Sequence, residues 1–202
     1  MKLSALFLFA AVANAQIAKF DHIVVIVQEN RTPDNLFQGL CTSAQLCSTT
    51  PNASQYNIQT SNWLDKHSTT GITQPMPVAL ANSYDLSHAH TAFVSQCDAP
   101  PTASTSAAGV CKMDGAGDVK CSGTCPVKPQ FRFVDNSKGI VNPYLALARQ
   151  YGWGNYFFQT NQGPSFPAHQ FLFGGTSAPS AADDAKGTFA SENTGGEAGC
   201  VR

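Results

Sequence analysis

The amino-acid sequence predicts an α/β fold in which a layered, largely parallel central sheet is flanked by helices. Residues 23–27 are an unbroken run of β-branched side chains, which is typical of a strand buried on both faces of a parallel sheet. Downstream, amphipathic helical patterns alternate with a further strand candidate and with loop insertions. This alternation favours an α/β arrangement over a β-sandwich. The 202 residues are enough for one domain with a core.

The composition indicates a packed globular protein and argues against several classes of partner. Hydrophobic residues make up 43% of the chain, which argues against disorder. The 12 basic and 13 acidic side chains leave a formal net charge of -1, so we expect no nucleic-acid surface. Beyond the first residues no apolar run is long enough to span a bilayer, so we expect no transmembrane segment in the mature chain.

The N-terminus has the pattern of a signal peptide. A short positive end precedes an apolar stretch over residues 3–12, and Ala13-Asn14-Ala15 is an A-x-A cleavage site. We expect residues 1–15 to be removed, so that the mature chain begins at Gln16. The protein is therefore predicted to be secreted or periplasmic.

The number of cysteines fits an exported protein, because an oxidising compartment pairs cysteines. The seven are Cys41, Cys47, Cys97, Cys111, Cys121, Cys125 and Cys200. The close spacings of the first two and of Cys121 with Cys125 suggest disulfides within loops, and the third and fourth would close another loop. The sequence does not fix this connectivity, and the odd count leaves one thiol over, for which Cys200 is the candidate. A zinc site on Cys121 and Cys125 is the alternative, although it lacks a second ligand pair at finger-like spacing.

The segment after the first strand is expected to be mostly loop. A turn at Thr32-Pro33-Asp34 leads into no more than a short helical turn, and residues 41–80 are predicted to be a polar surface excursion. Asp85 or Ser87 is then expected to cap a helix with an apolar face, made of Leu86, Ala89, Phe93 and Val94. Residues 98–128 are small, polar and cysteine-bearing, and are predicted to form another insertion.

Regular structure resumes in the last third of the chain. Asn142 and Pro143 predict the start of a helix that Gly152 ends, with an apolar face of Tyr144, Leu145, Leu147 and Ala148. The aromatic segment 155–159 is a strand candidate whose rings we expect in the core. A further helix is predicted to start near Ser165 and to end at Gly174 and Gly175.

Two positions combine features that suggest chemistry on an anionic substrate. Glu29 and Asn30 follow the predicted first strand and offer hard oxygen ligands for a divalent cation. Ser165 follows Gly163-Pro164 at a predicted helix N-terminus, where backbone N–H groups and the helix dipole favour a phosphoryl group. A serine hydroxyl is a weak nucleophile until a metal ion or a base activates it. A cation held by Glu29 and Asn30 would provide that activation.

Four segments together resemble the phosphoesterase family of exported acid phosphatases and phosphatidylcholine-type phospholipases C. They stand in the family's order from Phe20 to about Glu197 and read HIVVIVQENRTPDNLF, DLSHAH, KMDG and YFFQTNQGPSFPAHQFLFGGTS. The combination of ENRT-x-D with GPSFP is specific. The resemblance implies an alkaline-phosphatase-like α/β fold and a divalent metal ion as cofactor. It also implies a phosphate-ester substrate, which is a small molecule or a phospholipid head group.

The resemblance also implies roles for individual residues. The family's E-N-R motif places Glu29 and Asn30 on the metal ion, and its G-P-S/T motif makes Ser165 the nucleophile, in contact with that ion. The histidine after the D-L segment contacts phosphate, for which His88 is the better match and His90 the second. Arg31 and Asp34 match the motif in a supporting role. Lys112 and Asp114 match as well, without a chemical role, and Pro33 replaces the family's usual phenylalanine.

The family pattern continues beyond what this chain contains. Family members are longer and complete the metal shell with a downstream pair of aspartates, so the resemblance implies that residues 16–202 are the N-terminal part of a phosphoesterase domain, a fragment with an incomplete fold. Asp183 and Asp184 match no family motif and are predicted to be solvated loop carboxylates.

Two other functions stay open at this point. The chain could be a non-catalytic exported protein that keeps only a disulfide-containing scaffold. It could also hydrolyse sulfate esters, although the C-x-P-x-R type signature of sulfatases is absent from the sequence.

Overall fold

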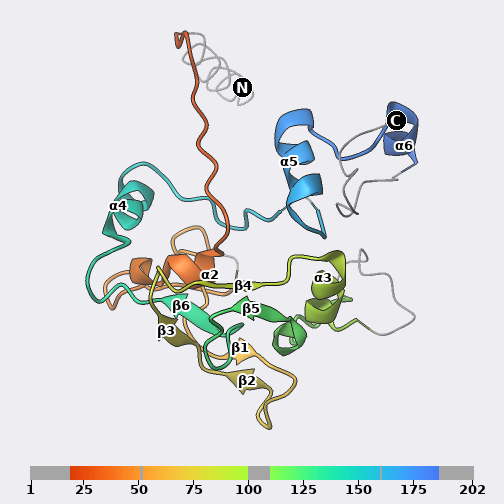
Figure 1. Cartoon of the computed structure of the whole chain (residues 1–202). Coiled ribbons are helices and arrows are strands. Elements are labelled where there is room, and N and C mark those ends of the chain that lie inside the picture. Colours follow the sequence, from red (N-terminus) through yellow and green to blue (C-terminus); the bar gives the residue numbers. More distant parts are fainter. Residues whose placement is uncertain (1–18, 51, 100–109, 160, 187–202) are drawn as a thin grey trace, which may run out of the picture. The chain divides into compact units, whose positions relative to one another are not determined.

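Short elements joined by long loops dominate the computed structural model, which describes residues 19–50, 52–99, 110–159 and 161–186 (Figure 1). The chain divides into two compact units, Met1–Arg31 and Thr32–Arg202. The helices are α2 (Pro33–Leu36), α3 (His90–Cys97), α4 (Asn142–Gln150), α5 (Ser165–Gly174) and α6 (Ala181–Ala185), with 3-10 turns η1 (Gln38–Leu40) and η2 (Ala116–Asp118). The strands are β1 (Trp63–Leu64), β2 (Ile72–Thr73), β3 (Met76–Val78), β4 (Tyr84–Leu86), β5 (Cys121–Gly123) and β6 (Arg132–Val134). The predicted signal peptide lies outside the described residues.

The strand predicted over residues 21–27 does not form, and this prediction is wrong. The segment has no regular secondary structure, and Ile23 to Val27 are 57% to 82% exposed. β-branched side chains favour an extended backbone, but a strand is stable only when a neighbour satisfies its backbone N–H and C=O groups. None of the strand pairs in the described part of the chain includes these residues.

Three two-stranded sheets make up the β structure of the described residues. β3 pairs with β6 in parallel, with Met76 opposite Arg132. The pairs β1–β2 and β4–β5 are antiparallel. Helix α2 lies against the parallel pair, where the Asn35 side-chain amide donates to the Arg132 carbonyl oxygen at 2.7 Å. The protein is thus a mixed α/β structure with a small parallel sheet and flanking helices, and the layered arrangement around one central sheet stays a prediction.

Two of the predicted helices are confirmed. Helix α4 starts at Asn142 with a proline in its first turn and buries Leu145, as its apolar face requires. Helix α5 starts at Ser165 and ends at Gly174, and the C-cap residue Gly175 adopts a left-handed conformation with φ of 74°. Glycine reaches this conformation without the strain that a Cβ atom would cause.

Two other predictions for local structure are wrong. Helix α3 starts only at His90, because Asp85 and Leu86 belong to strand β4 and pair with β5. Residues 155–159 form a turn and irregular chain instead of a strand, and Phe157 and Phe158 are 90% and 74% exposed. The long-range pairing of β4 overrides the local helix signal, as tertiary context commonly does.

Three disulfides close loops within this unit. They join Cys41 to Cys47, Cys97 to Cys111 and Cys121 to Cys125. The suggested pairing is confirmed, and the zinc alternative on Cys121 and Cys125 is wrong because both thiols are consumed. Cys200 lies outside the described residues.

No helix in the described segments is long and apolar enough to cross a membrane, and α5 has only 10 residues.

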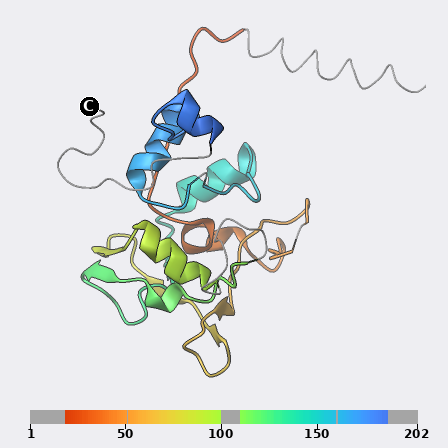
Figure 2. The ribbon, with the colours of Figure 1, turned by 90° about the vertical axis from the view of Figure 1, so that its right-hand side faces the viewer.

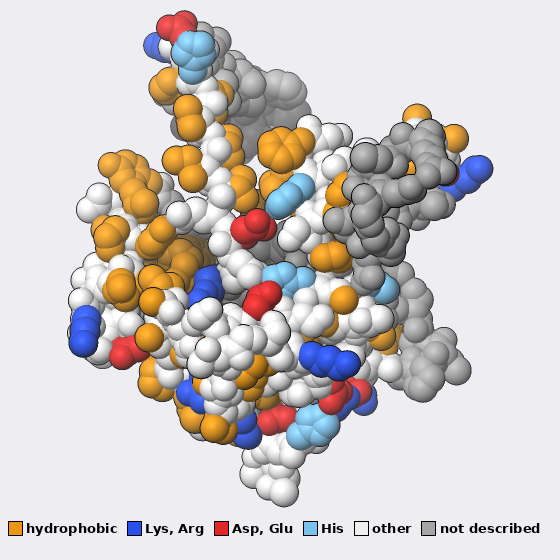
Figure 3. Space-filling model, viewed as in Figure 1, with side chains coloured by type: hydrophobic (Ala, Val, Ile, Leu, Met, Phe, Trp, Pro, Cys, Tyr) orange, Lys and Arg blue, Asp and Glu red, His pale blue; other side chains and the backbone are white. Residues whose placement is uncertain are grey.

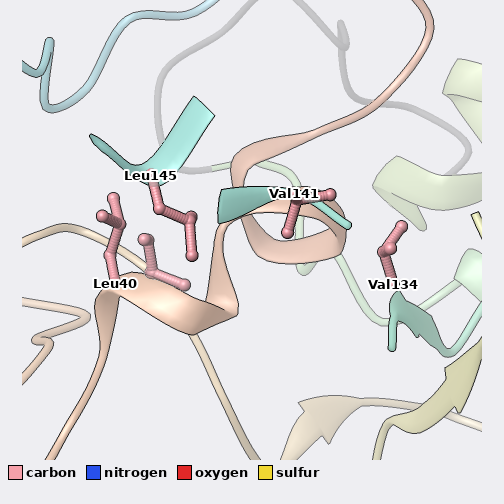
Figure 4. Close-up of a cluster of buried hydrophobic side chains, with 5 residues drawn as sticks. Leu40, Val134, Val141 and Leu145 are labelled. Carbon is pink, nitrogen blue, oxygen red and sulfur yellow. The ribbon is translucent and has the colours of Figure 1, made fainter. Parts of the chain in front are cut away.

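The hydrophobic core gathers side chains from η1, β6, α4 and two loops (Figure 4). The buried members are Leu40, Ile58, Val134, Val141 and Leu145. Trp153 closes one side, with its ring centroid 4.8 Å from that of Phe37. At Gly39 a Cβ atom would come within 2.6 Å of Leu145 Cδ1, so any larger residue there would displace the end of this core side chain.

We expect Leu145→Ala to lower the free energy of unfolding by about 2–5 kcal/mol, because truncation leaves a cavity in this core. Leu147→Ala on the same helix is the control, since Leu147 is 56% exposed and its truncation should change stability by no more than about 0.5 kcal/mol. Urea unfolding followed by circular dichroism measures both. Similar destabilisation by the two substitutions would contradict the assigned core.

Candidate active site

A cavity of about 610 Å³ opens between the DLSHAH segment, strand β5 and the Gly-Pro-Ser turn. Its walls are formed by Asp85, Leu86, Ser87, His88, Ala89, Lys120, Cys121, Ser122 and Pro164. Two of the four motifs of the sequence therefore meet in space. This cavity is the candidate active site.

Strand pairing fixes the floor of the cavity. Asp85 stands opposite Ser122 and Leu86 opposite Cys121 in the antiparallel pair β4–β5. The register continues past the strands, because the Ser87 N–H donates to the Lys120 carbonyl oxygen at 2.9 Å. At Gly123, with φ of 78°, a Cβ atom would come within 2.7 Å of the Ser83 carbonyl oxygen, so this pairing depends on a glycine.

The two histidines of DLSHAH have different positions. His88 lines the cavity, and its Nε2 lies 3.3 Å from Asp85 Oδ1. His90 lies outside the cavity lining and donates through Nδ1 to the Gln162 carbonyl oxygen at 2.6 Å. This second contact ties the start of α3 to the loop before the Gly-Pro-Ser turn. Figure 2 shows the ribbon with these elements in a second view, turned by 90° from that of Figure 1.

Ser165 is the first residue of α5 and is exposed to solvent. It directly follows Pro164 of the cavity wall. The first turn of α5 has backbone N–H groups without partners inside the helix, and the helix dipole adds partial positive charge there. The Asn161 side-chain amide donates to the Gly163 carbonyl oxygen at 2.9 Å and shapes the turn that presents the serine. A phosphoryl group bound beside His88 would meet a favourable environment at this turn.

Glu29 and Asn30 belong to the other compact unit, Met1–Arg31, whereas His88 and Ser165 belong to Thr32–Arg202. Glu29 and Asn30 are both exposed to solvent. A carboxylate, a carboxamide and a hydroxyl are all hard oxygen donors, so the chemistry of this donor set fits a divalent cation. The metal site of Glu29, Asn30 and Ser165 stays a prediction. Within the described segments no group of three or more His, Cys, Asp or Glu side chains is arranged to hold a metal ion.

The remaining residues of the first motif have structural roles. The Thr32 hydroxyl caps helix α2 by accepting from the Asn35 N–H at 3.2 Å. Asp34 Oδ1 accepts from the Gln59 N–H at 2.8 Å and so anchors the segment 41–80. This segment was predicted to be a polar surface excursion, but it contains strands β1 to β3 and the core residue Ile58. Burial raises the pKa of Asp34, and the hydrogen bond from Gln59 opposes this shift. The supporting role expected for Asp34 in the active site stays a prediction.

The KMDG segment is part of an ion-pair network rather than of the cavity. Asp98 accepts from both Lys66 and Lys112 at 2.9 Å, and Asp118 lies 2.6 Å from Lys66. His67 Nε2 adds a contact of 2.7 Å to Asp118. Figure 3 shows basic, acidic and histidine side chains gathered on the lower part of the face in view.

The backbone of KMDG packs closely against α3. The Lys66 N–H donates to the Asp114 carbonyl oxygen at 2.9 Å. A Cβ atom at Gly115 would come within 1.9 Å of the Ser95 carbonyl oxygen, which leaves no room for any side chain. Together with the Cys97–Cys111 disulfide, these contacts give the motif a structural explanation that its sequence alone did not suggest.

Hydrogen bonds from Lys66 and Lys112 lower the pKa of Asp98 from its ordinary value of 3.8 to about 2. A carboxyl group with a lowered pKa stabilises the folded state above its ordinary pKa, and this stabilisation is lost as the pH falls from about 3.8 towards 2. We therefore expect the unfolding free energy to fall more steeply over this range in the wild type than in Asp98→Asn. Urea unfolding at several pH values tests this, and parallel profiles of the two proteins would contradict it.

Several cavity residues were not recognised from the sequence. Lys120 and Ser122 lie in the stretch interpreted as an insertion, and Asp85 was interpreted as a helix cap. The close spacing of Cys121 and Cys125 was the available signal, because a disulfide-closed turn is a common end for a strand pair. Asp183 was expected in a loop but lies in helix α6, where its Oδ2 accepts from the Ser180 hydroxyl at 2.6 Å.

An α/β chain with a histidine-bearing cavity beside a Gly-Pro-Ser turn is compatible with a hydrolase that acts on ester bonds. Comparison with protein families supports that class, because the model of the Phosphoesterase family matches residues 20–200. The chain belongs to the Phosphoesterase family. Comparisons with curated proteins and with solved structures found no match. Family membership suggests the hydrolysis of phosphate esters.

Proposed function

We propose that the protein hydrolyses phosphate esters through Ser165, with a divalent metal ion. The observation that supports this most directly is the cavity in which His88 and the Gly-Pro-Ser turn meet, in a chain that matches the Phosphoesterase family over residues 20–200. The two segments lie far apart in the sequence. Their meeting at an open cavity is what a site for an external substrate requires.

In the first step Ser165 Oγ attacks phosphorus and the bond from phosphorus to the ester oxygen breaks. The Ser165 hydroxyl loses its proton, the departing alkoxide takes up that proton and leaves as the alcohol, and a phosphoseryl group remains on the protein. In the second step water attacks phosphorus, the bond to Ser165 Oγ breaks, and inorganic phosphate leaves. The serine hydroxyl is restored with a proton from that water.

His88 acts as a phosphate-binding residue in this scheme. Its imidazole can donate a hydrogen bond to a non-bridging phosphoryl oxygen, and the nearby Asp85 carboxylate, 3.3 Å from Nε2, helps to orient the ring. The N-terminal turn of α5 contributes backbone N–H groups to the same anion. Both groups compensate the negative charge of the phosphoryl group.

The metal ion would be held by Glu29, Asn30 and the Ser165 oxygen. When bound, such an ion lowers the pKa of a coordinated hydroxyl and compensates phosphoryl charge. Hard divalent cations prefer oxygen ligands, and this donor set contains only oxygen. The proposal requires the unit Met1–Arg31 to bring Glu29 to the start of α5.

The resemblance seen in the sequence extends the proposal. We assign the protein to the acid phosphatase or phospholipase C type, with an alkaline-phosphatase-like layered fold. The three disulfides and the N-terminal sequence pattern support export from the cell. The rival reading is a non-catalytic exported scaffold, and the next two experiments separate it from the enzyme.

Ser165→Ala should reduce kcat for an aryl phosphate by at least about 10³-fold, because the substitution removes the nucleophile while substrate binding remains. Ser61→Ala is the matched control, since Ser61 is exposed and does not line the cavity. Release of the aryl alcohol measures the rate. Unchanged turnover by Ser165→Ala would remove this serine from the mechanism.

Glu29→Gln should weaken divalent cation binding by more than about 10²-fold, because the loss of a charged ligand exceeds the effect of losing an outer partner. Titration calorimetry with Mg²⁺, Mn²⁺ and Ca²⁺ measures the affinity. Asp21→Asn in the same exposed segment should bind as the wild type does. A wild-type protein that takes up none of these cations would favour the non-catalytic scaffold.

A further inference from the structure

Lys120 stands on the wall of the cavity that faces the DLSHAH segment. Pairing of β4 with β5 places it there, because its carbonyl oxygen accepts from the Ser87 N–H at 2.9 Å, one residue before His88. The residue is exposed, so its side chain is not held inside the protein. A lysine has a flexible four-carbon stem and a compact ammonium group, so it can reach a ligand in an open cavity next to its own backbone.

Lys120 differs from three other lysines in its ion-pair partners. Lys66, Lys112 and Lys128 each lie within 4 Å of a carboxylate. Across the described segments no ion pair joins Lys120 to a carboxylate, and it is the only lysine or arginine that lines the cavity. The carboxylate in the cavity wall, Asp85, faces His88 at 3.3 Å. The cavity thus contains a cation that a bound anion can pair with.

The number of charges on the substrate determines what this cation contributes. A phosphomonoester carries a charge of about -1.5 to -2 at neutral pH, whereas a phosphodiester carries about -1. The Coulomb energy between a lysine and the phosphoryl group is proportional to that charge. The contribution of Lys120 to binding is therefore about twice as large for the monoester.

We propose that Lys120 is a substrate-binding residue that favours phosphomonoesters over phosphodiesters. The inference rests on the proposed function, since it assigns the substrate class of the same cavity. Ser122, directly opposite Asp85 in the strand pair, adds a hydroxyl donor to the same wall. Lys120, directly before strand β5, thus provides substrate selection, and the Gly-Pro-Ser turn provides the nucleophile.

The test compares Lys120→Gln with the wild type on an aryl phosphomonoester and on the matching aryl phosphodiester. We expect KM to rise about fivefold for the monoester and about twofold for the diester, with kcat nearly unchanged. Lys120→Arg should restore the monoester KM, because it keeps the positive charge. Lys138→Gln is the control, since Lys138 is an exposed lysine outside the cavity. An unchanged monoester KM, or equal losses for both esters, would overturn the inference.

A binding measurement separates this inference from the proposed mechanism. Inorganic phosphate titrated into the Ser165→Ala protein should bind about fivefold more weakly when Lys120→Gln is added. This readout needs no nucleophile, so it holds even if Ser165→Ala retains activity and the proposed mechanism fails. Equal phosphate affinity with and without Lys120→Gln would overturn the role of Lys120 and leave the mechanism intact.

Discussion

The register of the β4–β5 pair is the constraint on which the candidate site depends. It sets Asp85 opposite Ser122 and Leu86 opposite Cys121, and so brings the loop that carries His88 beside Lys120, which directly precedes β5. A shift of one residue would turn every side chain of a strand to the other face. The Cys121–Cys125 disulfide closes the loop that contains β5, and Gly123 allows the backbone to approach Ser83. The disulfide thus restrains β5 itself, and the close approach at Gly123 restrains its pairing with β4.

Two helices and the three disulfides follow from local signals in the sequence. Helix α4 was predictable because a proline at its start and an apolar face at helical spacing agree, and α5 because Gly174 and Gly175 follow its apolar run. The disulfide pairs could be predicted for the same reason, since the two cysteines of each pair lie at most 14 residues apart in the sequence. In these places local sequence and structure agree.

The predictions that failed concern residues whose structural partners are distant in the sequence. The run Ile23–Val27 shows that the chain is apolar and extended, but it does not say which strand pairs with it. Asp85 has the local pattern of a helix cap, yet β5 lies more than 30 residues away and recruits it into a strand. Lys120 was missed for the same reason, because only that pairing carries it to the cavity. The candidate nucleophile was recognised from the local Gly-Pro-Ser pattern and the family resemblance, whereas the opposite wall was not.

The close contact at Gly115 limits the substitutions that this position can accept during evolution, as well as how the chain folds. A Cβ atom there would lie 1.9 Å from a backbone oxygen of α3, and no rotation of a side chain can relieve a clash with the main chain. Every missense change of this codon would therefore push the helix away from the loop that the Cys97–Cys111 bridge ties to it. We therefore expect neutral substitutions to accumulate at other exposed positions while this glycine stays unchanged.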